Sequence, residues 1–345
     1  MSFNKTNNLG QFISRDVKDD AVLEYFVDRV EASFPWEQVE EIICKEYGIR
    51  VIGLYVINIG YDDLNFRAET DAGPVFIKFF CKEKTLAYCL SAAQIIKEAA
   101  GLGIVTPGIV KNLSGFEVSN VSGAYFSVMD YVTGGDYYSN EIYPGKKDIE
   151  AIITNVNLFQ YINTTPIVVY NPWSAINFTA EYNKNKYLLT SFESELIQPT
   201  FEKFATINLG VLPKSFVHGD ILRYNVIRST GEMNWIVDYG SCSILPRIFE
   251  FAVMCNDILF NTSDLDHVKE IYDFAFNFFH HLKNLDSNEI DVLPIVIQAG
   301  FALSILAARA EKQRDQTGDP SQHDYWIDKG NAGLNYFRTT NFQFN

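Results

Sequence analysis

Polar side chains flank short apolar runs in two neighbouring segments of the sequence. The first segment, FVHGDILRYNVI, contains His218, Asp220 and Asn225, and the second, WIVDYGS, contains Asp238. Carboxylate and amide oxygens are hard ligands that suit Mg²⁺, which proteins usually hold with one or two carboxylates together with substrate phosphates. These residue types therefore favour a site for a metal–nucleotide complex, with Asn225 and Asp238 as metal ligands.

The spacing of these residues points to phosphoryl transfer. Asp220 and Asn225 stand at the interval of the protein-kinase pattern H-R-D-x-x-x-x-N, in which the aspartate accepts the proton of the attacking hydroxyl. Asp238 follows the apolar WIV as the aspartate of DFG follows its strand. We therefore predict that Asp220 is the catalytic base. The alternative is that these residues only cap turns, as Asp and Asn often do.

A lysine interrupts the apolar run VFIKFF. A charge in such a strand is costly unless it is paired or faces a ligand, so we predict that Lys78 contacts nucleotide phosphates. Alternatively, Lys78 faces water on the outer side of a sheet. The acidic or polar partner of this lysine stays open among Glu83, Gln94 and Glu98.

The elements that would position these residues fall into two groups. A helix over 35–47, stopped by Gly48, precedes the strand-like RVIGLYVINIG, the hairpin strands LNFRAET and PVFIKFF, a helix over 85–100, and the strands GIVKNL and AYFSVMDYV. Helices are expected beyond them over 147–163, 176–207, 247–260, 265–284, 288–313 and 324–337. The sequence thus predicts two lobes, 1–133 with an antiparallel sheet and 134–345 mostly helical.

The most apolar stretch, VLPIVIQAGFALSILAA, covers residues 292–308. It is short for a membrane span and contains Pro294 and Gln298, so a buried helix is expected. The first residues, MSFNKTNNLGQF, contain no apolar run like that of a signal peptide. We therefore expect a cytoplasmic protein without a membrane partner.

The sequence resembles the aminoglycoside phosphotransferase-like family of small-molecule kinases, most of all its hydroxylysine kinase and homoserine kinase branch. The resemblance rests on GYDDLNFRAET, IKFF, HGDILRYN, IVDYGSCSILPRIFEFA and HDYW, which together span most of residues 35–335. It implies an α+β, bilobal, protein-kinase-like fold, with ATP or GTP as co-substrate and Mg²⁺ as cofactor.

The resemblance also implies roles for further residues. Asn65 would present its amide to phosphate, although a plain turn with Asp62 and Asp63 is the alternative for this loop. His218 would support the catalytic loop, and Glu250 would brace it, unless Glu250 only interacts with a helix dipole. Backbone groups of Asp130, Tyr131 and Val132 would hydrogen-bond adenine. The apolar side chains of Val75 and Met129 would face its ring, unless they are ordinary core residues.

The net charge and the cysteine content argue against some classes of binding partner and metal site. The formal charge is −15 and the pI about 4.8, which argues against a nucleic-acid binder. The five cysteines show no C-x-x-C spacing, so neither a disulfide framework nor a zinc site is expected. The expected partners are a nucleotide and a small hydroxyl acceptor, and the chain would be a monomer or a homodimer.

The acceptor implied by the resemblance is a small amino-bearing alcohol or amino acid. Asp257, Tyr325 and Trp326 are candidates to bind it through an ion pair and cation–π contacts. The duller alternatives are a solvated helix charge and ordinary packing of the last helix. Two other functions stay open, an antibiotic phosphotransferase and a catalytically inactive kinase-like binding protein.

Overall fold

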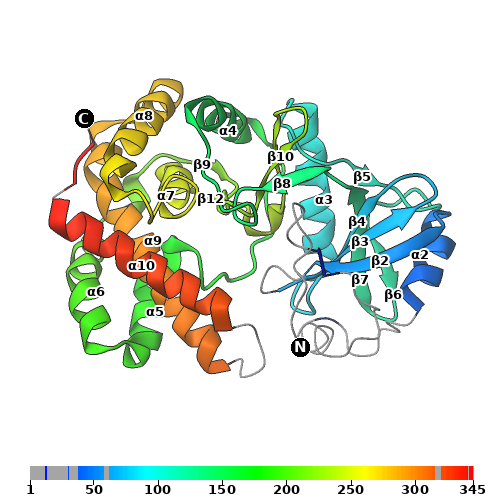
Figure 1. The fold of residues 1–345 in the computed structure, drawn as a ribbon, viewed down its shortest axis with the longest axis horizontal. Coiled ribbons are helices and arrows are strands. Elements are labelled where there is room, and N and C mark those ends of the chain that lie inside the picture. The colour runs from blue at the N-terminus through cyan, green and yellow to red at the C-terminus, as the bar shows by residue number, and fades with distance from the viewer. Residues whose placement is uncertain are drawn as a thin grey trace. The chain divides into compact units, whose positions relative to one another are not determined.

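The computed structural model describes residues 12–13, 30, 38–57, 62–314, 320–340 and 342–344. The chain divides into two compact units (Figure 1), and each is described by itself. Unit 1 comprises Met1–Ile142, Ile162–Val169 and Val226–Gly240, and unit 2 comprises Tyr143–Tyr161, Tyr170–Asn225 and Ser241–Asn345. The chain thus returns twice to unit 1 after residue 133, where the sequence placed a single boundary.

Unit 1 is built on a seven-stranded antiparallel sheet. Its strands are β1 (Phe12–Ile13), β2 (Val51–Ile57), β3 (Leu64–Thr70), β4 (Val75–Phe79), β5 (Ile109–Val110), β6 (Ser119–Val121) and β7 (Ala124–Asp130). The order is β1-β2-β3-β4-β7-β5, and β6 pairs with β7. The predicted hairpin is confirmed, because β3 and β4 pair with Leu64 opposite Phe79 and turn at a glycine, Gly73, with φ +109°.

Two helices pack against this sheet (Figure 1). The helix α2 (Val39–Tyr47) shares a core cluster with Ile77 and Phe79 of β4, and α3 (Leu86–Gly101) shares a second cluster with Phe80. Side chains alternate across a strand, so Lys78 projects from the face opposite to Ile77 and Phe79. The predicted helix start at 35–37, like Gly60 in the next loop, lies outside the described residues.

A second, three-stranded sheet of unit 1 has the order β11-β10-β8. It joins β8 (Gly134–Asp136), β10 (Val226–Ser229) and β11 (Asn234–Ile236). The sequence missed β8, because GGD carries almost no side-chain pattern. The β10–β11 hairpin brings Asp238, just beyond β11, into the same unit as Lys78.

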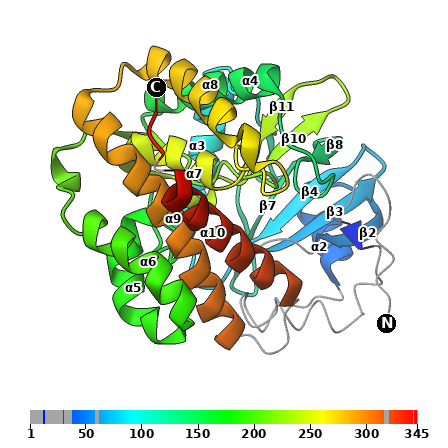
Figure 2. The ribbon, with the colours of Figure 1, turned by 60° about the vertical axis from the view of Figure 1, so that its left-hand side comes forward.

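Unit 2 is mostly helical, as expected. It contains α4 (Lys146–Leu158), α5 (Phe178–Asn185), α6 (Ser191–Phe204), α7 (Ile248–Asn256), α8 (Leu265–Lys283), α9 (Ser287–Arg314) and α10 (Pro320–Thr340). Figure 2 shows α9 beside α5, α6, α7 and α10, with which it packs. By length and composition α9 could cross a membrane. Most of its apolar side chains are buried in unit 2, Phe301, Leu303 and Leu306 among them, which confirms the predicted core helix.

The prediction of one continuous helix over 176–207 was wrong. A short 3₁₀ turn, Lys186–Leu188, separates α5 from α6, and a capping box starts α6. The Thr190 side chain accepts a hydrogen bond from the Glu193 N–H at 3.2 Å, and the Glu193 carboxylate accepts one from the Thr190 N–H at 2.8 Å. The motif T-S-F-E, residues 190–193, is the sequence pattern of a capping box and indicates that a new helix begins here.

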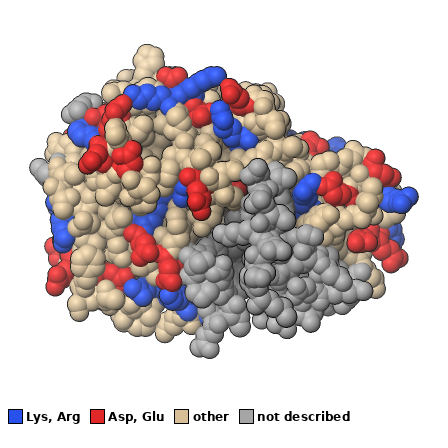
Figure 3. Space-filling view, viewed as in Figure 1, with Lys and Arg blue, Asp and Glu red and all other residues tan. Residues whose placement is uncertain are grey.

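Surface charges of both signs are mixed. On the face shown in Figure 3, Lys and Arg side chains of the described residues lie among Asp and Glu side chains. A continuous basic track, as nucleic-acid binders use, does not form on this part of the described surface.

Candidate functional site

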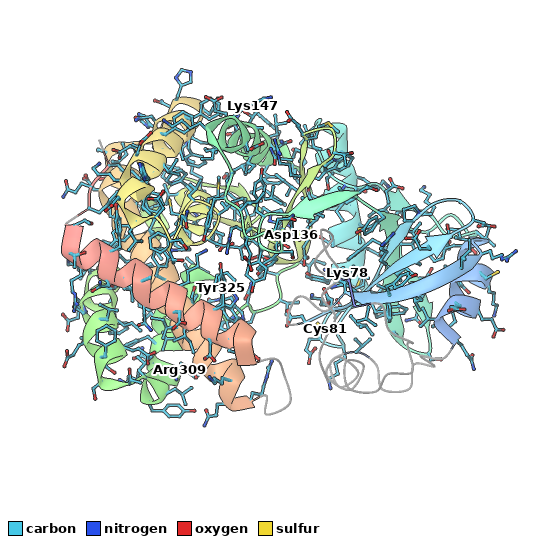
Figure 4. The ribbon with its side chains drawn as sticks, in the orientation of Figure 1. Lys78, Cys81, Asp136, Lys147, Arg309 and Tyr325 are labelled. Atoms are coloured by element: carbon cyan, nitrogen blue, oxygen red, sulfur yellow. The ribbon has the colours of Figure 1, made fainter. Side chains whose placement is uncertain are left out.

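The strand lysine is buried and doubly paired. Lys78 of β4, labelled in Figure 4, is 7% exposed, and its Nζ lies 2.9 Å from Asp238 Oδ1 and 3.0 Å from Asp63 Oδ2. The alternative of a water-facing lysine is therefore wrong. Lys78 is paired with Asp63 rather than with any of the three partners left open in the sequence, and Glu98 instead accepts hydrogen bonds from the Thr164 N–H and hydroxyl.

Asp63 is a functional candidate that sequence reasoning missed. It is buried just before β3, and Lys84 Nζ donates to its two carboxylate oxygens at 2.8 and 2.7 Å. The Cys81 N–H donates to Asp63 Oδ1 at 2.9 Å. The interpretation of Asp62 and Asp63 as a plain turn therefore fails for Asp63, which is a shared anchor for two lysines.

Ion pairing outweighs burial in this cluster. Burial opposes the charge of Asp63, but Lys78 and Lys84 hold the pKa of its carboxyl well below the usual range. Burial would lower the pKa of Lys78, but Asp238 and Asp63 raise it above the ordinary value. Loss of hydration raises the pKa of Asp238 less than Lys78 lowers it, so its net pKa is depressed. All these groups are charged at neutral pH.

Asp238 has a backbone conformation that few residues adopt. Its φ is +63°, in the left-handed region that Asn and Asp tolerate better than most side chains. The Gly240 N–H donates to Asp238 Oδ1 at 3.2 Å, and the Tyr88 hydroxyl donates to the Gly240 carbonyl at 2.7 Å. The Asp238 side chain is 39% exposed, which leaves its carboxylate accessible to a cation.

The other predicted nucleotide residues lie in the same sheet or directly after its strand β7. Asn65 of β3 stands directly opposite Lys78 in the β3–β4 register and is buried. Met129 and Val132 are buried, and the ring of Tyr131 lies 5.1 Å from the guanidinium of Arg67.

One of the backbone groups predicted to contact adenine already has a partner. The Asp130 N–H donates to the Gly108 carbonyl at 2.9 Å, and the Asp130 carboxylate accepts from the Gly108 N–H at 3.2 Å. The Asp130 N–H is therefore used within unit 1, and the contacts of the other backbone groups with adenine stay a prediction.

Unit 2 holds together the residues of the predicted catalytic loop. The loop follows β9 (Lys214–Val217), which pairs antiparallel with β12 (Ser243–Pro246). Gly219 has φ +76°, and a Cβ at this position would lie 3.0 Å from the Ser241 carbonyl oxygen, so glycine is required. Asn225 Nδ2 donates to Asp220 Oδ2 at 2.7 Å and to the Asp220 carbonyl at 3.0 Å. The amide nitrogen thus faces Asp220, and the amide oxygen is the group suited to a cation.

Glu250 braces the start of this loop. It lies in the first turn of α7, is buried, and accepts hydrogen bonds from the backbone N–H of His218 and, at 3.2 Å, of Gly219. The His218 ring is fully buried, 5.5 Å from the ring of Phe159. The geometry fits the supporting roles implied for both residues.

Glu250 should make folding stability depend on pH. Burial raises its pKa from the ordinary 4.5 to about 7, against the hydrogen bonds from His218 and Gly219. The folded state therefore binds a proton that the unfolded state releases, and the stabilisation is complete below pH 4.5 and lost as pH rises through 7. Between pH 4.5 and pH values above 7, the free energy of unfolding of wild type should therefore fall by up to about 3 kcal/mol relative to that of Glu250→Gln. Urea unfolding of both proteins at several pH values measures this; a constant difference would contradict the assignment.

Asp257, a candidate for binding an acceptor amine, is already paired within unit 2. It is fully buried at the end of α7, where its carboxylate accepts hydrogen bonds from the Lys329 ammonium and, at 2.6 Å, from the Arg223 N–H. Burial lowers the pKa of Lys329 to about 8 although Asp257 opposes this. Asp257 is therefore neither a solvated helix charge nor a carboxylate open to an ammonium.

Aromatic rings cluster near the catalytic loop within unit 2. Trp326 is buried in α10, with ring centroids at 5.0 Å from Tyr325, 6.0 Å from Trp173 and 6.3 Å from Tyr224. Tyr325 is labelled in Figure 4, and its hydroxyl donates to Asp257 at 2.8 Å. Tyr224 directly precedes Asn225, and it and Trp173 are partly exposed.

The two predicted metal ligands carry oxygen donors of the kind that hard cations accept. Asn225 of unit 2 offers an amide oxygen, and Asp238 of unit 1 offers a carboxylate oxygen, and Mg²⁺ accepts both types of ligand. The part of the chain that the structure describes contains no group of three or more His, Cys, Asp and Glu side chains that could hold a metal ion by themselves.

One part of the chain matches the model of a protein family. Residues 172–278 match the phosphotransferase enzyme family. This segment contains Asp220, Asn225, Asp238, Glu250 and Asp257. No curated protein sequence matches the chain.

Solved structures of phosphotransferases share the fold. A spectinomycin phosphotransferase in complex with ADP and spectinomycin has a TM-score of 0.63 at 13% identity, covering 89% of this chain and 98% of that chain. An amicoumacin kinase in complex with AMP-PNP and Ca²⁺ has a TM-score of 0.64 at 12% identity, and the match covers 91% of this chain and 97% of that chain. A choline/ethanolamine kinase family protein from Mesorhizobium loti has a TM-score of 0.60 at 17% identity, and the match covers 95% of this chain and 97% of that chain. The predicted α+β kinase-like fold is confirmed.

Proposed function

We propose that the chain is an ATP- or GTP-dependent phosphotransferase that phosphorylates the hydroxyl of a small amino-bearing alcohol or amino acid. The observation that carries the proposal is the ion pair between Lys78 and Asp238, 160 residues apart in sequence. Phosphotransferases of this fold use a strand lysine for the phosphates and an aspartate after a later strand for the metal. The match of residues 172–278 to the phosphotransferase enzyme family supports it.

The residues divide the reaction between them. Asp220 orients the acceptor hydroxyl and accepts its proton while the oxygen attacks the γ-phosphorus and the nucleoside diphosphate leaves. Lys78 steadies the nucleotide phosphates. Asn225 and Asp238 supply oxygen ligands for Mg²⁺, which neutralises phosphate charge when bound. Positioning and electrostatics account for most of the catalysis expected.

The acceptor class rests on unit 2. The rings of Trp173 and of Tyr224, which directly precedes Asn225, both lie beside the ring of Trp326, and this aromatic cluster offers cation–π contacts to an ammonium group. Structural neighbours include an aminopropanol kinase and a choline/ethanolamine kinase family protein, which their names associate with amino alcohols. The hydroxylysine and homoserine kinase branch remains a prediction within this class.

A panel assay tests the proposal. The protein is incubated with ATP or GTP, Mg²⁺ and one acceptor at a time from amino alcohols, hydroxy amino acids, aminoglycosides and neutral sugars, and ADP or GDP release is measured. Release stimulated by an amino alcohol or a hydroxy amino acid is expected. Nucleotide binding without stimulation by any acceptor would favour the alternative of an inactive kinase-like protein.

The preferred acceptor should depend on its amine. Replacing an amino alcohol by its uncharged isostere should lower kcat/KM about 10-fold or more, because the isostere loses the cation–π contacts with the aromatic rings of unit 2. Steady-state kinetics with the matched pair of compounds measures the ratio. Equal kcat/KM for both compounds would move the search to neutral sugars and nucleosides.

An antibiotic phosphotransferase is the second candidate function. Two structural neighbours are antibiotic kinases by name, for spectinomycin and amicoumacin. The net charge of −15 also suits a polycationic substrate. In the panel, a kcat/KM for an aminoglycoside above that for every amino alcohol and amino acid would select this function.

A further inference from the structure

Four charged side chains of unit 1 form an alternating row of ion pairs. Lys84 Nζ lies 2.8 and 2.7 Å from the two oxygens of Asp63, Lys78 Nζ lies 3.0 Å from Asp63, and Lys78 Nζ also lies 2.9 Å from Asp238. Lys84, Asp63 and Lys78 are each less than a tenth exposed. The row therefore contains two positive and two negative charges, and only its Asp238 end is open to solvent.

Without Lys84, the single positive charge of Lys78 would face two negative charges. Lys78 contacts both Asp63 and Asp238, and one ammonium between two carboxylates carries a net charge of −1, which repels phosphate. Lys84 supplies the missing positive charge at the buried end. Once a nucleotide-bound cation offsets Asp238, the remaining three groups carry a net +1, and Lys78 is the one that contacts the open end.

We propose that Lys84 is a positioning residue for nucleotide binding, acting through Asp63. It holds Asp63 as its counter-ion, so that Asp63 fixes Lys78 without cancelling the charge that Lys78 offers to the phosphates. This inference rests on the nucleotide-dependent function proposed above. The pair of Asp63 and Lys84 performs the task that a helix glutamate performs for the strand lysine of protein kinases.

The surroundings of Lys84 suit this task. It lies in the turn between β4 and α3, where its N–H donates to the Cys81 carbonyl at 2.9 Å and its ammonium lies 5.5 Å from the ring centre of Tyr88. The acidic residue of α3, Glu98, is only partly buried and is bonded to Thr164. A buried partner for Lys78 thus comes from the loop before β3, and a lysine before α3 balances it.

The decisive variant is Lys84→Met, which keeps the length of the side chain and removes its charge. Calorimetry compares the affinities for ADP and adenosine in the presence of Mg²⁺. ADP affinity should fall roughly 10- to 100-fold, because Asp63 is left to compete for Lys78. Adenosine affinity should stay within about twofold of wild type, because adenosine has no phosphates. Lys82→Met, which removes an exposed lysine from the same turn, is the matched control and should change neither.

Two further variants separate positioning from folding. Lys84→Arg should restore ADP affinity, and adding Asp63→Asn to Lys84→Met should recover most of it, because the unbalanced carboxylate is removed with its partner. If Lys84→Met does not fold, the double variant decides: near-wild-type ADP affinity supports the proposal. A loss as large as that of Lys78→Met overturns it.

Other outcomes are equally informative. An ADP affinity of folded Lys84→Met within twofold of wild type, or parallel losses for ADP and adenosine, would overturn the role of Lys84. Wild-type protein that binds neither ADP nor adenosine would instead count against the proposed function itself.

Discussion

Replacement of Asp220 by alanine is expected to abolish phosphoryl transfer while leaving nucleotide binding intact. A positioned general base contributes about 10²- to 10⁴-fold, and kcat should fall by at least that factor. Asp220 is partly exposed and its backbone carbonyl, which accepts from Asn225 Nδ2 at 3.0 Å, is untouched by the substitution. The loop should therefore keep its shape, with ADP affinity and Tm close to wild type.

Kinetics with the acceptor identified in the panel, together with calorimetry for ADP, measure these effects. Asp220→Asn tests the base role separately, because its amide keeps the size of the carboxylate but cannot accept the proton, and it should be as inactive as the alanine variant. Asp266→Ala, an exposed carboxylate in the first turn of α8, is the matched control and should retain full activity. Turnover by Asp220→Ala within about tenfold of wild type would rule out the base assignment.

The catalytic loop was predictable because its information is local. Asp220 and Asn225 stand at a short fixed interval, and the structure joins their side chains at 2.7 Å. Lys78 was predictable for a related reason, since a charge inside an apolar strand requires a partner or a ligand. In both places a few neighbouring residues in the sequence are enough to indicate that the side chain needs a partner or a ligand.

Asp63 could not be found in this way. Asp62 and Asp63 are neighbours of the same type in a turn, yet Asp62 is exposed and Asp63 is buried. The difference arises from register, because Leu64 pairs with Phe79 and this places Asp63 beside the N–H of Cys81. A one-residue shift would exchange the two, and nothing in the local sequence fixes that register.

Asp257 shows a second limit. Its partners come from distant parts of the chain, Arg223 at 34 residues and Lys329 at 72 residues from it. A carboxylate at the end of a helix is usually solvated, and only the packing of α7 against its neighbours buries this one. The proposal of an amine-bearing acceptor therefore rests on the aromatic rings rather than on this carboxylate.

Asp238→Asn is expected to weaken nucleotide binding in the presence of Mg²⁺ but not in its absence. Asparagine tolerates the φ of +63° at this position, so the backbone should be preserved. The substitution removes an anionic ligand from a hard-cation site, and Mg²⁺-dependent affinity for ADP should fall about 10- to 100-fold. Without Mg²⁺, ADP should bind as well as to wild type or better, because Lys78 no longer shares its charge with Asp238 and a carboxylate no longer repels the phosphates.

Calorimetry with ADP, in Mg²⁺ and in EDTA, measures both effects on one protein. Glu232→Gln is the matched control, since Glu232 has φ +59° in the hairpin between β10 and β11 and the change removes the same charge from the same unit. Its metal dependence should equal that of wild type. An unchanged metal dependence of Asp238→Asn would refute the ligand assignment. A loss of ADP affinity of equal size in Mg²⁺ and in EDTA would instead assign Asp238 to holding Lys78 alone.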